Sequence, residues 1–244
     1  MLLIAFLVVK SRVEQPLMPL RIFRMRTLAA ANVGGLLLGG SFFGFVFIGT
    51  LYMQQVLGYS ALQAGVAWLA TSLTSIALVG LSQKLATRIS PGPVMAVGMT
   101  LIGGGILWAT QAPVHGHFWG SLAGPFVIAG AGGAFSFVPI SIGGLTGVAE
   151  REAGLASGLL NTSQQLGGAI GVAIASSVAA THVKTLLAGG DATSAALTGG
   201  FQWAFWVCGA TALLAPLTAA VLVRRRRTNE IDGAVSALEV GGVN

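Results

Sequence analysis

The stretch from Ala153 to Ala180 reads AGLASGLLNTSQQLGGAIGVAIASSVAA and carries no formal charge. At about 100° per residue, large apolar side chains gather on one side of such a helix and small or polar ones on the other. The polar stripe holds Ser157, Asn161, Gln164, Gly168, Gly171 and Ala175, opposite Leu159, Leu166 and Ile170. A soluble amphipathic helix would carry Lys, Arg or Glu on its wet side. The pattern therefore favours a helix in lipid whose polar stripe faces other helices or a water-filled cavity.

The composition of the 244-residue chain is that of an integral membrane protein. Charged residues make up 8% of the chain and hydrophobic residues 54%, whereas about 25% of the residues of a soluble domain are charged. The basic residues behind the net charge of +6 lie between or beyond the apolar runs, so we interpret them as topology signals and expect no nucleic-acid partner. Cys208 is the single cysteine, and we expect neither a metal nor a cofactor.

Six uncharged runs are each long enough to cross a bilayer as a helix, which takes about 20 residues. They cover residues 28–51, 61–83, 93–111, 118–142, 153–180 and 200–223. We therefore predict an all-α membrane protein, a bundle of six transmembrane helices over residues 28–223.

The flanking segments complete the expected organisation. Residues 1–9 are apolar but too few to span a bilayer, so we interpret them as a truncated helix stub from a larger protein; the alternative is a genuine start with a short interfacial anchor. Residues 10–27 are predicted to form a basic cytoplasmic linker, and residues 224–244 a basic and then disordered cytoplasmic tail.

Loop charges predict the orientation, because short loops rich in Lys and Arg stay in the cytoplasm. With the linker inside, Lys184 is the only one of the 13 basic residues that falls outside. We expect a multi-pass protein of the cell membrane with its C-terminus in the cytoplasm.

Residues 39–47 (GGSFFGFVF) and 131–139 (AGGAFSFVP) indicate an internal repeat. Their alignment pairs Gly40 with Gly132, Phe43 with Phe135, Phe45 with Phe137 and Val46 with Val138. The offset spans three helices, an odd number, so the first and fourth helices should run in opposite directions. That is the arrangement of an inverted three-plus-three repeat.

Three phrases carry a resemblance to a known family. They are AGLASGLLNTSQQLGGAIG at residues 153–171, PLMPLRIFRMRT at 16–27 and LYMQQVLGYSALQAG at 51–65. With six helices in two inverted triplets, the chain resembles the C-terminal half of a major facilitator superfamily transporter, and in particular the fourteen-helix drug:proton antiporters. The resemblance places the first and fourth helices on a central cavity, the second and fifth at the seam between halves, and the third and sixth toward lipid.

The resemblance implies proton-coupled efflux of drug-like amphipathic or cationic solutes by alternating access, with the missing N-terminal half as partner. The alternative is a truncated, non-transporting half that acts as a partner subunit or is a remnant. The family's acidic inner-loop position is Lys84 here, in GLSQKLATRI from Gly80. No Asp, Glu, Lys or Arg lies inside the six predicted spans, so any proton-coupling residues must lie in the missing half.

Candidate site residues come from helix faces rather than from a catalytic motif. On the first helix, polar and aromatic side chains share one face with Gly39, and the fifth helix carries a cluster of amides. We predict that the substrate path is lined by Asn32, Phe43, Thr50, Gln54, Asn161, Gln164 and Gln165. The alternative for each is helix packing with interhelical hydrogen bonds. Ser157 and His182 lie too far apart along one helix to form a nucleophile–base pair, so we expect no enzyme.

Overall fold

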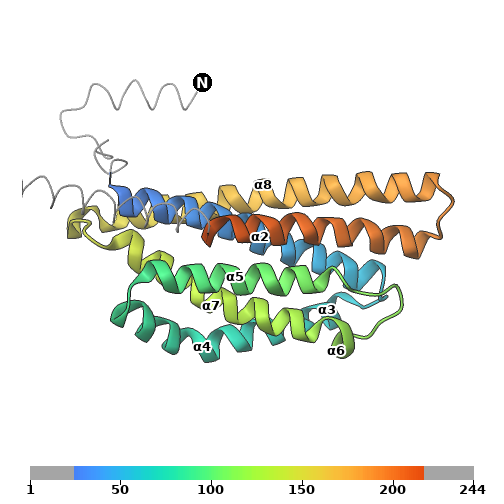
Figure 1. The fold of residues 1–244 in the computed structure, drawn as a ribbon, viewed down its shortest axis with the longest axis horizontal. Coiled ribbons are helices and arrows are strands. Elements are labelled where there is room, and N and C mark those ends of the chain that lie inside the picture. Colours follow the sequence, from blue (N-terminus) through green and yellow to red (C-terminus); the bar gives the residue numbers. More distant parts are fainter. Residues whose placement is uncertain (1–24, 217–244) are drawn as a thin grey trace, which may run out of the picture.

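The computed structural model describes residues 25–216, and every regular element among them is helical (Figure 1). The elements are α2 (Arg26–Gln55), α3 (Ala61–Ala67), α4 (Leu69–Arg88), α5 (Pro91–Ala109), α6 (Phe118–Ser121), α7 (Ala123–Leu145), the 3-10 turn η2 (Glu150–Glu152), α8 (Ala153–Ala188) and a last helix over residues 193–216. These correspond to the six predicted spans, with α3 and α4 forming the second and α6 and α7 the fourth. The predicted stub, the tail and all of the linker before residue 25 lie outside the described residues.

Several helices are longer than their uncharged runs. The structure continues α4 through Lys84 to Arg88, where the sequence suggested a loop, and α8 to Ala188, eight residues beyond the predicted end. The last helix begins at residue 193 rather than 200. The extensions of α4 and α8 include Lys84, Arg88 and Lys184, whose side chains water solvates beyond the hydrocarbon without ending the helix. The extra residues 193–199 of the last helix carry no charge.

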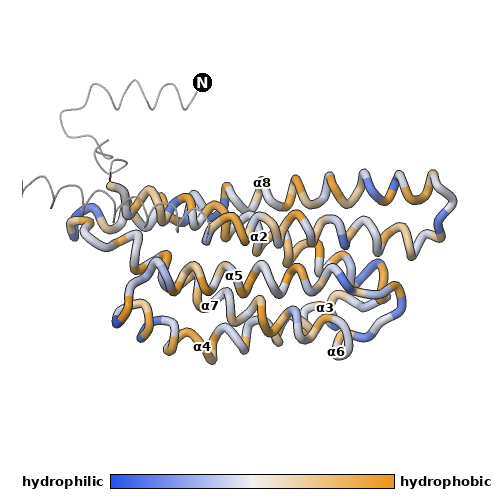
Figure 2. Tube along the Cα trace, viewed as in Figure 1, coloured by the Kyte–Doolittle hydropathy of each residue, from blue (hydrophilic) through white to orange (hydrophobic). Residues whose placement is uncertain are grey.

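The observed helices are long and apolar enough for a membrane-spanning protein. Within the described residues, five helical stretches are long and apolar enough to cross a membrane, with α3 and α4 counting as one. Figure 2 shows that hydrophilic residues gather at the turns and helix ends of the bundle. This is the distribution expected of a multi-pass membrane protein.

Figure 1 shows α2 and α7 running in opposite directions, as the inverted repeat predicted. The packing follows the same symmetry, since the first helix α2 packs on the fifth, α8, and the fourth helix α7 packs on the second, α4. A Cβ at Gly39 of α2 would meet the backbone of Gln164, and a Cβ at Gly130 of α7 would meet the backbone of Thr71. Gly39 and Gly130 therefore make corresponding contacts, at an offset of 130 − 39 = 91 residues, whereas the predicted pairing of Gly40 with Gly132 has an offset of 132 − 40 = 92.

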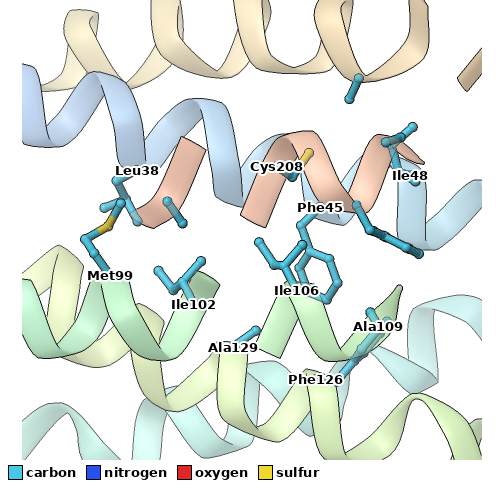
Figure 3. Close-up of a cluster of buried hydrophobic side chains, with 14 of the residues drawn as sticks. Leu38, Phe45, Ile48, Met99, Ile102, Ile106, Ala109, Phe126, Ala129 and Cys208 are labelled. Atoms are coloured by element: carbon cyan, nitrogen blue, oxygen red, sulfur yellow. The ribbon is translucent and has the colours of Figure 1, made fainter. Parts of the chain in front are cut away.

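The hydrophobic core lies between α2, α5, α7 and the last helix (Figure 3). Phe45 of α2 makes an edge-to-face contact with Phe126 of α7, with ring centroids 5.2 Å apart, and also packs on Phe205 of the last helix. Cys208 is buried against Gly44. Here α2 and α7 form the centre of the bundle.

Two spans leave much of their surface uncovered. Only 17% of the most apolar window of α3–α4 and 22% of that of α8 are buried, against 56% for α2 and 50% for α7. Among the five helical stretches compared, the second and fifth are thus the least covered. The resemblance placed these same two helices at the seam between the two halves of a transporter.

Candidate functional site

The four predicted residues of α2 lie on one side of the helix, and each is half-buried. They are Asn32, Phe43, Thr50 and Gln54. Gly39, on the same predicted face, is buried against α8. The four side chains therefore share one partly open face of the central helix, as a period of 3.6 residues requires.

Asn32 links α2 to α8. Its Oδ1 accepts a hydrogen bond of 2.6 Å from Ser163 Oγ, and its Nδ2 donates to the Leu28 carbonyl at 2.8 Å. The amide therefore bonds across the helix pair, the arrangement that we set as the alternative to substrate contact. These two bonds use one of the two Nδ2 hydrogens and one of the two Oδ1 lone pairs of this half-buried side chain.

Thr50 holds the indole of Trp68, the residue at which α3 gives way to α4. Trp68 Nε1 donates to Thr50 Oγ1 at 3.0 Å, and Thr50 Oγ1 donates to the Val46 carbonyl at 2.7 Å. The indole also stacks on Phe126, with ring centroids 4.3 Å apart. Because the single Thr50 proton is already used, the primary effect of this hydroxyl is to orient Trp68.

A group of phenylalanine rings joins the two central helices. Phe42 of α2 lies edge-on to Phe137 of α7 at 5.7 Å between centroids and is 6.4 Å from Phe43. Phe43 in turn covers Gly168 of α8, where a Cβ would collide with its ring. All three rings are half-buried, so together they form an aromatic surface shared by the first and fourth helices.

The predicted residues of α8 are divided between two environments. Gln164 packs along α2, with its Cγ 3.2 Å from the position of a Cβ on Gly35. Asn161 and Gln165 are exposed on the surface of α8. An exposed amide at mid-helix is costly in hydrocarbon, so this surface calls for a polar neighbour or water.

Sequence reasoning missed Phe42, Ser163 and the site role of Phe137. Phe42 lies about 100° from the predicted stripe, and its contact with Phe137 depends on how two helices cross. Phe137 did appear in the repeat alignment, which was the one available signal. Ser163 belongs to the polar NTSQQ run, but its partner is 131 positions away.

The site is electrically neutral. The formal charges that fall within the described helices lie toward their ends, as with Lys84 and Arg88 in α4 and Lys184 in α8. Within the described residues, no group of three or more His, Cys, Asp or Glu side chains could hold a metal ion. The chemistry that the arrangement offers is therefore aromatic contact together with neutral hydrogen bonding.

Comparison with known proteins gives a family match. The model of the Major Facilitator Superfamily matches residues 6–172. The cephamycin export protein CmcT of Amycolatopsis lactamdurans is 35% identical over 175 residues, which cover 70% of this chain and 36% of that protein.

Two further relatives extend the match. EfpA of Mycobacterium tuberculosis, named as an uncharacterized MFS-type transporter, is 30% identical over 222 residues, covering 86% of this chain and 42% of EfpA. The tetracenomycin C resistance and export protein of Streptomyces glaucescens is 33% identical over 180 residues, covering 71% and 32%. The matches span 32% to 42% of these three relatives. These three relatives are named as transporters or export proteins.

Proposed function

Because this chain belongs to the Major Facilitator Superfamily, we propose that it is the C-terminal half of an exporter of drug-like amphipathic or cationic organic solutes. The half would work by alternating access in the cell membrane, with its C-terminus in the cytoplasm. Relatives named for the export of cephamycin and tetracenomycin C support an export function.

The observation that carries the proposal is the neutral aromatic surface between α2 and α7. Phe42, Phe43 and Phe137 offer ring faces and edges, and the bonded pair Asn32–Ser163 lies further along α2. Rings can contact an apolar or cationic solute without fixing its orientation, and a few polar groups then give modest selectivity. Such a surface suits loosely specified organic solutes.

The partner in this proposal is a second helical bundle that covers α4 and α8. The matched relatives are more than twice as long as the segments they share with this chain. The uncovered surface of α8 carries Asn161 and Gln165, whose amides would find partners there or face a water-filled path. Solute would then pass between α2 and α7 on one side and the second bundle on the other.

Proton exchange would supply the energy. The middle of each described helix lacks Asp and Glu, and proton coupling in a membrane needs a titratable group facing the path. We therefore place the coupling groups in the second bundle. Under this proposal the 244-residue chain alone moves little or no solute.

The test is dye export from cells that lack their own major efflux pumps. The chain is expressed together with the second bundle that the proposal requires, and the accumulation of an aromatic cationic dye and of a non-aromatic cation is measured with and without a proton uncoupler. We expect uncoupler-sensitive export of both, and Phe42→Leu or Phe137→Leu should reduce export of the aromatic dye more than export of the other cation.

A matched control is Phe201→Leu, because Phe201 is buried at the other end of the bundle against Tyr52. It should lower the export of both solutes equally, through the amount of folded protein. Equal effects of all three substitutions would contradict the assigned solute surface. Absence of export from cells that contain this chain folded with the second bundle would contradict the exporter and favour the non-transporting alternative.

A further inference from the structure

Four of the five tryptophans are on the surface of the described structure. Trp108 is 48% exposed, Trp119 83%, Trp203 52% and Trp206 52%. The fifth, Trp68, is half-buried between Phe45 and Phe126. We call the four exposed residues the tryptophan belt.

Hydrogen bonds place the belt at one end of the bundle. Gln202, next to Trp203, donates from Nε2 to the Ala112 carbonyl at 2.9 Å, close after Trp108 at the end of α5. The backbone N–H of Phe118, next to Trp119, donates to the Tyr59 hydroxyl at 3.1 Å. A Cβ at Gly124, five residues after Trp119, would meet the ring of Trp108, so the belt residues of α5, α6 and the last helix lie near the same end of the bundle.

The exposed side chains change character at the belt. On the side toward the middle of the bundle they are apolar, such as Val97 at 55% and Leu214 at 51% exposed. The whole of α5, α6 and residues 193–216 carries no charged residue. On the far side, the hairpin over residues 183–199 exposes Lys184, Asp191 and Thr193.

The lengths of the two hairpin helices agree with this division. The last helix begins ten residues before Trp203, which is about 15 Å of helix. Figure 1 shows the turn between α8 and the last helix extending past the ends of the other helices. His182 of α8 stacks on Trp203, with ring centroids 4.7 Å apart. The 30 helical residues from Ala153 to His182 are about 45 Å long, which is the thickness of a bilayer with its headgroups.

We propose that the tryptophan belt lies in the headgroup region of one leaflet and that the hairpin over residues 183–199 projects from that leaflet into water. Indole rings favour this region because an apolar ring and a polar N–H are both satisfied there. In the predicted orientation this is the outer leaflet. The proposal depends on membrane insertion but not on transport.

The belt is tested with the full chain in phosphatidylcholine vesicles that carry a spin label near the headgroup or deep in the acyl chain. In a Trp68→Phe variant, which keeps the belt alone, the shallow label should quench tryptophan fluorescence more strongly than the deep one. A variant with Phe at the four belt positions leaves Trp68, which neither label should quench strongly. Stronger quenching of the belt by the deep label, or none by either, would overturn the placement.

The hairpin is tested separately in intact cells, on a Cys208→Ser background that removes the single native thiol. A membrane-impermeant maleimide added outside should label Thr193→Cys on the hairpin and leave Val97→Cys on α5 unlabelled. Detergent should not be needed to label Thr193→Cys. Protection of Thr193→Cys until the membrane is dissolved, or labelling of Val97→Cys in the intact membrane, would contradict the proposal.

Discussion

The helix pairs α4–α7 and α2–α8 hold corresponding places in the inverted repeat, yet different chemistry joins them. Along α4–α7, three hydroxyls of α4 donate to backbone carbonyls of α7. They are Thr71 to Phe126 at 3.1 Å, Ser75 to Gly130 at 2.6 Å and Ser82 to Ala134 at 2.8 Å. We call this row the hydroxyl ladder.

Along α2–α8, a series of glycines lets the two backbones touch, whereas along α4–α7 the described residues make such a contact at Gly130, against the backbone of Thr71. A Cβ at Gly167 would meet the carbonyl of Leu36, and a Cβ at Gly171 would meet that of Gly40. We call this contact the glycine seam. The Asn32–Ser163 hydrogen bond also crosses between the two helices.

The two contacts differ in what they can tolerate. A carbonyl in the hydroxyl ladder already accepts a helical N–H, so the loss of one hydroxyl leaves no group unsatisfied and costs little. The glycine seam depends on van der Waals contact and weak Cα–H···O bonds at close approach. An added side chain there must push whole helices apart, so the seam is the more fragile of the two.

The largest expected effect is that of Gly167→Val in the glycine seam. The new side chain would overlap the Leu36 carbonyl, which a rigid helix cannot move aside. We expect a loss of stability at or above the upper end of the roughly 1–3 kcal/mol typical of overpacking. Unfolding by sodium dodecyl sulfate in mixed micelles, followed by circular dichroism, measures it.

Gly158→Val is the matched control on the same helix. Gly158 is exposed and has nothing within 4 Å of its Cβ position, so this change should cost far less. Equal losses for the two variants would mean that valine destabilises α8 by itself and that the glycine seam does not exist.

A smaller effect is expected when the hydroxyl ladder is removed by Thr71→Val, Ser75→Ala and Ser82→Ala together. At about 0.6 kcal/mol for an average interhelical bond in a membrane, the triple variant should lose about 2 kcal/mol. The same unfolding titration measures it. A triple variant less stable than Gly167→Val would reverse the ranking of the two contacts.

The helices could be predicted because uncharged runs of this length have few other structures available in a membrane. Their ends could not, because Lys84 and Lys184 stop a hydropathy run without stopping a helix. The opposite directions of α2 and α7 followed from the odd offset of the repeat. The exact alignment of α2 with α7 in the repeat did not follow from the sequence, because it depends on which glycine contacts which neighbouring backbone.

The site was predictable only as far as one helix determines it. The period of α2 placed Asn32, Phe43 and Thr50 on one partly open face. Their partners lie on other helices, far away in the sequence. Ser163 is 131 positions from Asn32, and Phe42 meets Phe137 only because α2 and α7 cross, so no local sequence pattern predicts either contact. Whether these residues bind a solute stays a prediction.

Ser163→Ala tests the polar link across α2–α8. It leaves the half-buried Asn32 Oδ1 without its 2.6 Å donor, while Asn32 Nδ2 keeps the Leu28 carbonyl. We expect a loss of about 1 kcal/mol, within the range measured for interhelical bonds in membranes. Ser157→Ala, an exposed position on the same helix, should change stability little. A loss equal to that of Gly167→Val would mean that this bond, rather than the glycines, holds α8 to α2.

The smallest effect is expected for Gly133→Ala, a glycine beside the hydroxyl ladder. The added Cβ would lie 3.3 Å from Ser75 Oγ and 3.7 Å from Phe42 Cε2, both side-chain atoms that can shift by a few tenths of an ångström. Alanine also favours a helix by up to about 1 kcal/mol over glycine, so the two effects should nearly cancel.

Gly167→Ala is the sharp comparison, because the same methyl group there meets a backbone carbonyl. If both alanines destabilise the bundle equally in the unfolding titration, α7 is packed on its neighbours as tightly as α8 is on α2, and the two contacts do not differ in tolerance. If only Gly167→Ala does so, an added methyl group is tolerated beside the hydroxyl ladder but not in the glycine seam.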